Sequence, residues 1–207
     1  MVAQERIGLK NVPSVTQILG TISNPKIDEW KESIGLQEAK RLAKEGREFG
    51  KAVHADIHNY FTKGELVSTD EKVLAQVGVV IEWSKQKVAS WVCFEHMAFN
   101  DTLPYCARID AVAELKTGEL VIVDFKTGKY NSETNELQMI AYLNCTRYDK
   151  YLVDPTKINR AILLFPRLGN CEEVVQPRDT RLWTIFNSVY SVWKWRTNKT
   201  GQFGLRA

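Results

Sequence analysis

The chain has 207 residues, which is enough for one well-packed domain and short for two. Hydrophobic residues make up 44% and charged residues 26%, an ordinary globular balance, and the net charge of +3 is compatible with a polyanionic partner without identifying one. No apolar run approaches the roughly 18 residues of a membrane span, and the opening MVAQERIGLKNVPSV has no long apolar stretch, so we expect neither a membrane partner nor a secretory signal.

The first part of the chain, about residues 13–88, is predicted to be helical. Ser14 can cap a short helix over about 15–21, and Pro25 suits the first turn of the next helix. A longer helix is expected over about 36–63, where apolar residues recur at helical spacing. Gly46 and Gly50 interrupt it and permit another backbone to approach closely. Its other face is basic, with Lys40, Arg41, Lys44, Arg47 and Lys51.

A further helix is expected over about 69–88, with Ser68 and Glu71 as its capping box. Three strands rich in Val, Ile and aromatic residues follow over about 91–99, 108–115 and 119–125. A tight turn at residues 116–118 joins the last two strands in a hairpin. A helix over about 134–148, strands over about 158–165 and 172–176, and an amphipathic helix over about 178–197 complete the predicted elements.

This order of elements predicts an α/β fold, in which a small mixed sheet is flanked by helices. The sequence has no internal repeat and no Pro/Gly-rich linker, so we expect one domain over residues 1–207. Within it, the N-terminal helical region is followed by a sheet core over about 91–176 and by the C-terminal helix.

The segment ARIDAVAELKTGELVIVDFKTGK, residues 107–129, carries the most chemical information. Asp110 lies near the start of one hairpin strand and Asp124 near the end of the next, so we expect them to be neighbours across the ladder. Two such carboxylates repel unless a cation lies between them, and oxygen ligands suit Mg²⁺ or Mn²⁺. The side chain of Lys126 points to the same face of the strand as that of Asp124. There it would orient or help to deprotonate a water, or stabilise the charge that develops on a phosphate. Taken alone, a D-x-K triplet is more often a surface ion pair.

Two helical pairs are also candidate site residues, each with a structural alternative. His54 and His58 share one helix face. His54 is either a metal ligand or a hydrogen-bonded structural histidine, and His58 is interpreted as structural. Gln138 and Tyr142 are four residues apart and either position a ligand or form an ordinary polar pair.

Ser14 and Thr16 begin a predicted helix, where free N–H groups favour a phosphate. Ordinary N-capping is the alternative, and the pattern alone favours it.

Five segments occur in the order PSVT-x-I-L, G-x-x-x-G-x-x-H, R-I-D, I-V-D-F-K-T and Q-x-x-x-Y. In this order they resemble the RecB-type branch of the PD-(D/E)xK nucleases. The pattern is most similar to the mitochondrial genome-maintenance exonuclease and to small phage and bacterial exonucleases, over roughly residues 13–145. The resemblance implies a restriction-endonuclease-like core and a metal-dependent deoxyribonuclease.

The resemblance also assigns roles to the residues that match the family's motifs. Metal ligands would be His54, Asp110, Asp124 and the backbone carbonyl of Phe125. The catalytic set would be Asp110, Asp124, Lys126, Gln138 and Tyr142. Ser14 and Thr16 would lie near the DNA backbone. Apart from the resemblance, DNA is also expected to contact the basic residues Arg47, Lys51, Arg108 and Lys129. Glu95, on the strand before the hairpin, is expected in the outer shell of the site.

The four cysteines, Cys93, Cys106, Cys145 and Cys171, are widely separated and contain no C-x-x-C pair. This argues against a zinc knuckle and a disulfide framework and favours isolated thiols in a reducing compartment. Relatives with an iron–sulfur cluster carry one cysteine before the nuclease core and three clustered after it. The cysteines here do not match, so we expect no such cluster.

The expected activity is hydrolysis of DNA phosphodiester bonds with Mg²⁺ or Mn²⁺, leaving 5′-phosphates. The resemblance favours an exonuclease on single-stranded ends in the cytoplasm of a bacterium or of a phage-infected cell, with replication or recombination proteins as candidate partners. The alternatives are a structure-specific or restriction-like endonuclease, a non-catalytic DNA-binding module on a nuclease fold, and a plain structural α/β domain.

Overall fold

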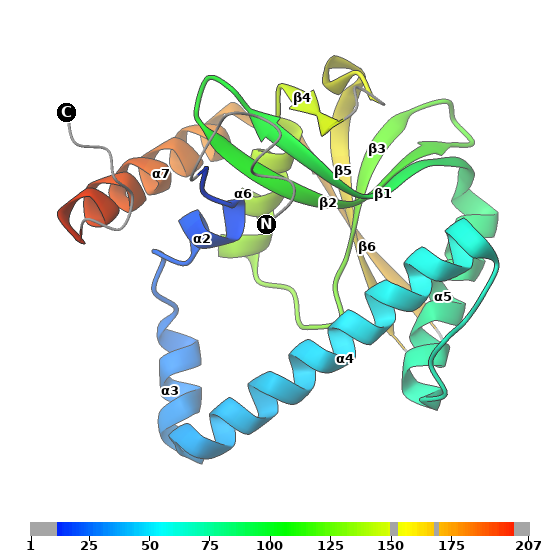
Figure 1. Ribbon diagram of the computed structural model, residues 1–207, viewed down its shortest axis with the longest axis horizontal. Coiled ribbons are helices and arrows are strands. Elements are labelled where there is room, and N and C mark those ends of the chain that lie inside the picture. The colour runs from blue at the N-terminus through cyan, green and yellow to red at the C-terminus, as the bar shows by residue number, and fades with distance from the viewer. Residues whose placement is uncertain (1–11, 150–152, 168–169, 201–207) are drawn as a thin grey trace.

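The computed structural model describes residues 12–149, 153–167 and 170–200 (Figure 1). Its centre is a six-stranded sheet in the order β4-β1-β2-β3-β5-β6. Strands β3 and β5 run parallel, and the other neighbouring strands run antiparallel, so the sheet is mixed. The strands are β1 Val88–Asn100, β2 Tyr105–Leu115, β3 Leu120–Phe125, β4 Arg147–Tyr148, β5 Ile158–Arg167 and β6 Asn170–Pro177.

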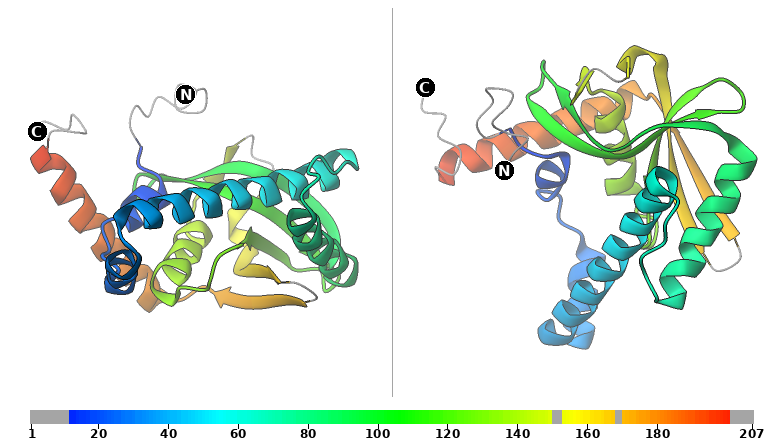
Figure 2. Two further views of the ribbon diagram at one scale, coloured as in Figure 1. Left: turned by 90° about the horizontal axis from the view of Figure 1, so that it is seen from below. Right: turned by 45° about the vertical axis from the view of Figure 1, so that its right-hand side comes forward.

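Helices cover both faces of this sheet (Figures 1 and 2). They are α2 Val15–Leu19, α3 Pro25–Ile34, α4 Leu36–Lys63, α5 Glu71–Lys87, α6 Ser132–Leu143 and α7 Thr180–Thr200, with a short 3-10 helix over Pro155–Lys157. One core lies between the sheet and α4 with α5, and the other lies between the sheet and α2, α6 and α7. The predicted restriction-endonuclease-like α/β fold with an N-terminal helical region is confirmed. Among the described helices, none is both long enough and apolar enough to cross a lipid bilayer.

Strand β3 is central, and both of its faces are buried. Val121, Val123 and Phe125 pack beneath α4 and α5, whereas Ile122 lies in the core shared with α6. A strand that is buried on both faces consists of a continuous apolar run, which accounts for LVIV before Asp124. Because side chains alternate along a strand, Asp124 lies on the same side as Ile122, toward α6.

The helix predicted over 134–148 ends earlier, at Leu143. Asn144 is its C-cap, and its side-chain amide donates a hydrogen bond to the carbonyl of Ile140 at 2.8 Å. Residues 147 and 148 then form β4, which pairs with β1. The Arg147 guanidinium lies 4.5 Å from the centre of the Phe99 ring. Tertiary pairing with β1 therefore prevails over the local helical pattern at this position.

The capping box predicted for α5, with Ser68 as the N-cap, is wrong in its cap residue. Asp70 is the N-cap of α5, and its carboxylate accepts a hydrogen bond from the amide of Lys72 at 2.8 Å. Ser68 lies two residues earlier, where its hydroxyl accepts a hydrogen bond from the amide of Asp70. Both residue types are good caps, so sequence alone does not select between them.

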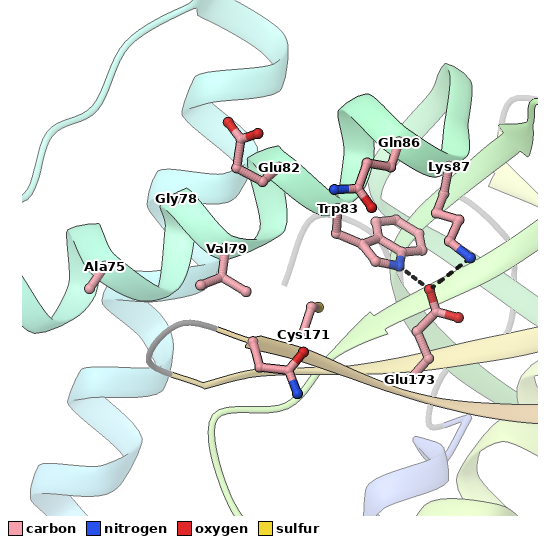
Figure 3. A pocket seen from close by; sticks show the side chains of 10 residues that line it. Ala75, Gly78, Val79, Glu82, Trp83, Gln86, Lys87, Cys171 and Glu173 are labelled. Atoms are coloured by element: carbon pink, nitrogen blue, oxygen red, sulfur yellow. Dashed lines mark hydrogen bonds and ion pairs between the residues drawn. The ribbon is translucent and has the colours of Figure 1, made fainter.

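Helix α5 is joined to the edge strand β6 by the side chains drawn in Figure 3. Trp83 Nε1 donates a hydrogen bond to a carboxylate oxygen of Glu173, and Lys87 Nζ lies 3.9 Å from the same oxygen. These residues line a groove between α5 and β6, and none of the site residues predicted from the sequence is among its lining residues. The groove therefore belongs to the packing of α5 on the sheet.

Asp56 connects the segment between α4 and α5 to helix α4. Its side chain is buried, and its two oxygens accept hydrogen bonds from the amides of Val67 and Ser68, each at 3.0 Å. Gly64, with φ of +77°, ends α4 in the left-handed region and starts this segment. The carboxylate thus supplies acceptors that an irregular segment lacks in its own backbone.

We expect Asp56→Ala to lower the free energy of unfolding by about 1–3 kcal/mol, because two backbone amides lose their acceptors. Urea denaturation of the variant and the wild type measures this difference. Glu65→Ala, at an exposed position of the same segment, is the control and should change stability by less than about 0.5 kcal/mol. Equal midpoints for Asp56→Ala and the wild type would contradict the proposed role of the carboxylate.

Candidate active site

Three acidic residues occupy one row across β1, β2 and β3. The ladder between β2 and β3 reaches Ala111 and Val123, so the next position places Asp110 opposite Asp124. On the other side of β2, the positions that flank Glu95 are paired with those that flank Asp110, so these two residues face each other. The row therefore contains the two aspartates of the hairpin and also Glu95.

The hairpin ladder ends at this row because a side chain replaces a main-chain partner. Asp110 Oδ2 accepts a hydrogen bond from the amide of Phe125 at 2.9 Å. On its other side, β3 stays paired with β5, and the amide of Lys126 donates to the carbonyl of Leu164 at 2.8 Å. The segment Asp124 to Lys126 is thus held by β5 while it leaves β2.

The side-chain alternation of β1 and β2 reverses at the same row. Ile109 lies in the core shared with α6 and α7, whereas Ala111, two residues later, lies in the core beneath α4 and α5. In a regular strand, residues two apart share one face. The irregular row leaves Glu95 and Asp110 only partly buried, and both line the groove against α4.

Helix α4 contributes His54 to this row. His54 Nε2 lies 2.9 Å from the carbonyl oxygen of Phe125, to which it donates, and Nδ1 lies 3.5 Å from Asp110 Oδ2. One turn earlier, Gly50 lets the helix approach the strand end, since a Cβ at this position would lie 3.1 Å from Thr127 Oγ1. The close approach predicted for both glycines occurs at Gly50, whereas a Cβ on Gly46 would meet nothing within 4 Å.

A chain of polar side chains extends from Asp124 toward α6. Lys126 Nζ lies 2.7 Å from Asp124 Oδ2 and donates to Gln138 Oε1 at 2.9 Å. Gln138 Nε2 in turn donates to the hydroxyl of Tyr142 at 2.6 Å. Burial, followed by the negative charge of Asp124, raises the pKa of Tyr142 well above its usual value, so the phenol is neutral at pH 7. The lysine is therefore held between a buried carboxylate and a side-chain amide.

The donor atoms at this row fit a hard divalent cation. His54, Glu95 and Asp110 each offer a ligand atom, and these atoms all lie within 4.8 Å of one another. The buried Asp124 Oδ2 receives no well-directed hydrogen bond from the described residues, although the Lys126 ammonium lies beside it. Carboxylate and carbonyl oxygens with one imidazole nitrogen are ligands that suit Mg²⁺ or Mn²⁺.

The pKa of Asp110 shows how strongly burial and the neighbouring carboxylate oppose its negative charge. Burial, and then the negative charge of Asp124, raises the pKa of Asp110 to about 7, while His54, the Phe125 amide and Lys126 act in the opposite direction. Without a cation, the row therefore favours a proton on this carboxyl at and below neutral pH.

A groove of about 870 Å³ opens over the row between α4 and the sheet, within the range of about 300–1,000 Å³ typical of ligand sites. Arg47, Lys51 and Arg108 line it. Lys129 instead lines a neighbouring groove together with Trp30. The basic face of α4 is also less free than its sequence suggests, because carboxylates on the same helix pair with two of its cations: Arg41 with Glu38 and Glu45, and Lys51 with Glu48.

Ser14 and Thr16 lie at the start of α2, on the part of the molecule that packs against α6 and α7. Ser14 Oγ accepts from the amide of Gln17, and Gln17 Oε1 accepts from the amide of Ser14, so the pair forms a capping box. Neither Ser14 nor Thr16 is among the lining residues of the groove over the acidic row. Capping accounts for Ser14 without a ligand.

Comparison with known proteins gives one family match. Residues 35–184, well over half of the 207-residue chain, match the family model described as the PD-(D/E)XK nuclease superfamily. No curated protein matches the chain. Among solved structures, one titled "Crystal structure of SSO0001" matches with a TM-score of 0.43 and 11% sequence identity, covering 92% of this chain and 80% of that chain. The family match includes the whole acidic row and both α4 and α6.

We expect Asp110→Asn to stabilise the cation-free protein increasingly as the pH rises from about 4 to about 7. The folded-state pKa of Asp110 lies above the value of about 3.9 for an unfolded chain, so its contribution to stability is lost as the pH rises through the folded pKa. The neutral amide avoids this loss and keeps an acceptor for the Phe125 amide. The gain at pH 7 should be about 1–4 kcal/mol.

Urea denaturation in a chelating buffer at several pH values measures this gain. Asp28→Asn, which removes an exposed carboxylate that pairs with Lys31, is the matched control and should give a small difference at every pH. A stability difference between Asp110→Asn and the wild type that does not vary with pH would contradict the prediction.

Proposed function

Because this chain belongs to the PD-(D/E)XK nuclease superfamily, we propose that it is a metal-dependent exonuclease that hydrolyses phosphodiester bonds at single-stranded DNA ends. The observation that carries the proposal is the register of the hairpin, which puts Asp110 and Asp124 at opposite positions, with the Lys126 ammonium 2.7 Å from the Asp124 carboxylate. Membership of the superfamily implies a metal-dependent nuclease, and the DNA end, the single strand and the RecB-type branch are the finer parts of the proposal.

We assign the cation to His54, Asp110, Asp124 and the carbonyl of Phe125, with Mg²⁺ or Mn²⁺ as the ion. When bound, the cation activates a water and offsets the charge that develops on the phosphate. His54 Nε2 and the Phe125 carbonyl oxygen lie 2.9 Å apart, so these two proposed ligand atoms are close neighbours. Asp110 is oriented by the Phe125 amide, which leaves its other oxygen available as a ligand.

Lys126 is proposed to stabilise the negative charge on the phosphate or to orient the attacking water. Its ammonium has three donors, and the contacts to Asp124 and Gln138 direct two of them. The third is available for a substrate oxygen. Gln138 and Tyr142 act as positioning residues, because their hydrogen bond fixes the amide that receives the lysine.

The groove over the row supplies the contacts expected for a nucleic-acid strand. Arg47, Lys51 and Arg108 line it and offer cations to the phosphates. We propose that Lys129 contacts the strand beyond this groove, in the neighbouring groove that contains Trp30 and Tyr130. Aromatic side chains stack on unpaired bases, which supports a single-stranded substrate. We keep replication or recombination proteins as candidate partners.

Replacing Lys126 with Ala should reduce the rate of DNA cleavage by at least about 100-fold, because the variant lacks the charge beside the reacting phosphate. The fold and DNA binding should remain, which circular dichroism and fluorescence anisotropy test. Lys157→Ala, at an exposed lysine of the 3-10 helix, is the matched control. Wild-type cleavage by Lys126→Ala in Mg²⁺ would exclude this role of the lysine.

An exonuclease needs a free end, so a circular single strand should remain intact while the linear form of the same sequence is degraded. Electrophoresis of both substrates with Mg²⁺ or Mn²⁺ measures the difference. Asp124→Asn serves as the inactive control that reveals a contaminating nuclease. Cutting of the circle by the wild type but not by Asp124→Asn would instead establish an endonuclease.

A further inference from the structure

We infer that Glu95 is a further ligand of the proposed cation, and that Arg108 is its counter-ion only while the cation is absent. Binding of the cation would then release the Arg108 guanidinium for a DNA phosphate. This inference rests on the proposed function, since it concerns the same metal site. From its sequence position, Glu95 was expected only in the outer shell of the site.

The position of Glu95 in the sheet supports a role as a ligand. Glu95 faces Asp110 across the β1–β2 ladder, and a carboxylate oxygen of Glu95 belongs to the group of ligand atoms within 4.8 Å that also includes His54. Its side chain is 23% exposed, which leaves it accessible from the groove while most of it is desolvated. An acidic side chain at this depth requires a positive partner.

The backbone at Glu95 is strained in a way that aims its side chain at the site. Among the described residues, Glu95 is the one non-glycine residue with positive φ, at +54°. This region costs an L-residue about 1–2 kcal/mol, and such strain concentrates at functional sites. Regular alternation from the buried Cys93 would direct Glu95 into the core beneath α6, whereas it lines the groove against α4. The strained backbone therefore keeps the Glu95 side chain out of the core and places it in the groove beside Asp110.

Two further features hold this irregular position. The ladder residues on either side of Glu95 remain paired with β2. In addition, His96 Nδ1 lies 2.9 Å from the carbonyl oxygen of Phe94, so an imidazole N–H bridges the strained residue. The conformation is therefore built into the strand and does not depend on a flexible loop.

The positive partner of Glu95 is Arg108, on the neighbouring strand. The Arg108 side chain is 69% exposed, so it can turn toward solvent at small cost. By contrast, Asp124 is held by Lys126, and Asp110 by the Phe125 amide. A divalent cation competes with Arg108 for the Glu95 carboxylate, and a released guanidinium matches the geometry of a phosphate.

Calorimetric titration with Mn²⁺, in the absence of DNA, tests the inference. We expect Glu95→Gln to weaken Mn²⁺ binding by about 10-fold or more, a loss typical of a coordinating or supporting group. Arg108→Gln should strengthen it several-fold, because the competing cation is gone. Glu114→Gln, an exposed acid on β2 away from the row, is the matched control and should bind as the wild type does.

A double-mutant cycle separates the exchange of partners from simple electrostatics. If Arg108 acts by occupying Glu95, then Glu95→Gln/Arg108→Gln should bind Mn²⁺ as weakly as Glu95→Gln alone. Additive effects of the two substitutions would overturn the exchange, because a through-space repulsion does not need the glutamate. Mn²⁺ affinity unchanged in Glu95→Gln would overturn the whole inference.

Two further variants separate a failure of the proposed metal site from a failure of the role of Glu95 and from unfolding of the Glu95→Gln variant. Asp110→Asn should abolish Mn²⁺ binding, and retained binding there would contradict the proposed function itself and not merely the part played by Glu95. Glu95→Gly suits a φ of +54° and removes the carboxylate without strain, so it replaces Glu95→Gln if that variant unfolds. It should show the same loss of Mn²⁺ affinity and at least wild-type thermal stability.

Discussion

The hydrogen bond from the Phe125 amide to the Asp110 carboxylate determines where the site forms. A hairpin normally satisfies its amides with main-chain carbonyls across the ladder. Here one amide pairs with a side chain, so β3 leaves β2 at this point and continues beside β5 alone. The residues that follow this strand end, Thr127 and Gly128, therefore line the groove beneath α4, whereas Asp124 stays buried beside β5.

The same hydrogen bond holds the Asp110 carboxylate in a largely buried position, where desolvation of a negative charge destabilises the fold. Glu95, Asp110 and Asp124 lie in one row, and the groups next to them are the Arg108 guanidinium, the Lys126 ammonium and the His54 imidazole. Such a set of acidic groups favours a bound cation at the expense of the stability of the fold. Stability and binding are thus opposed at this site, as is common where function needs buried charge.

Much of this arrangement follows from the sequence because its determinants are local. The short turn at residues 116–118 fixes the register of the hairpin, so the spacing of Asp110 and Asp124 sufficed to predict that they face each other. The two-residue period of a strand likewise predicted that Lys126 joins Asp124. The long helix α4 has the bounds that its apolar repeat indicates.

What the sequence did not reveal depends on longer-range geometry. The position of Glu95 opposite Asp110 requires the register of β1 against β2, which contains irregularities near Trp91, and a reversal of alternation that no local pattern encodes. Similarly, β4 arises from pairing with β1, and its two residues resemble the end of a helix until that partner is known. These features result from contacts between segments distant in the chain.

The contact between Gly50 and Thr127 has a consequence for how related sequences can diverge. The hydroxyl of Thr127 would lie 3.1 Å from a methyl group on residue 50, so one of the two groups would have to move by a few tenths of an ångström. In a lineage with alanine at position 50, the contact is relieved by a small shift of the Thr127 side chain, by loss of its hydroxyl, or by a slight movement of α4, and His54 with it, away from the strand end. We therefore expect positions 50 and 127 to coevolve, because the size of one side chain limits the size of the other at the contact between α4 and the end of β3.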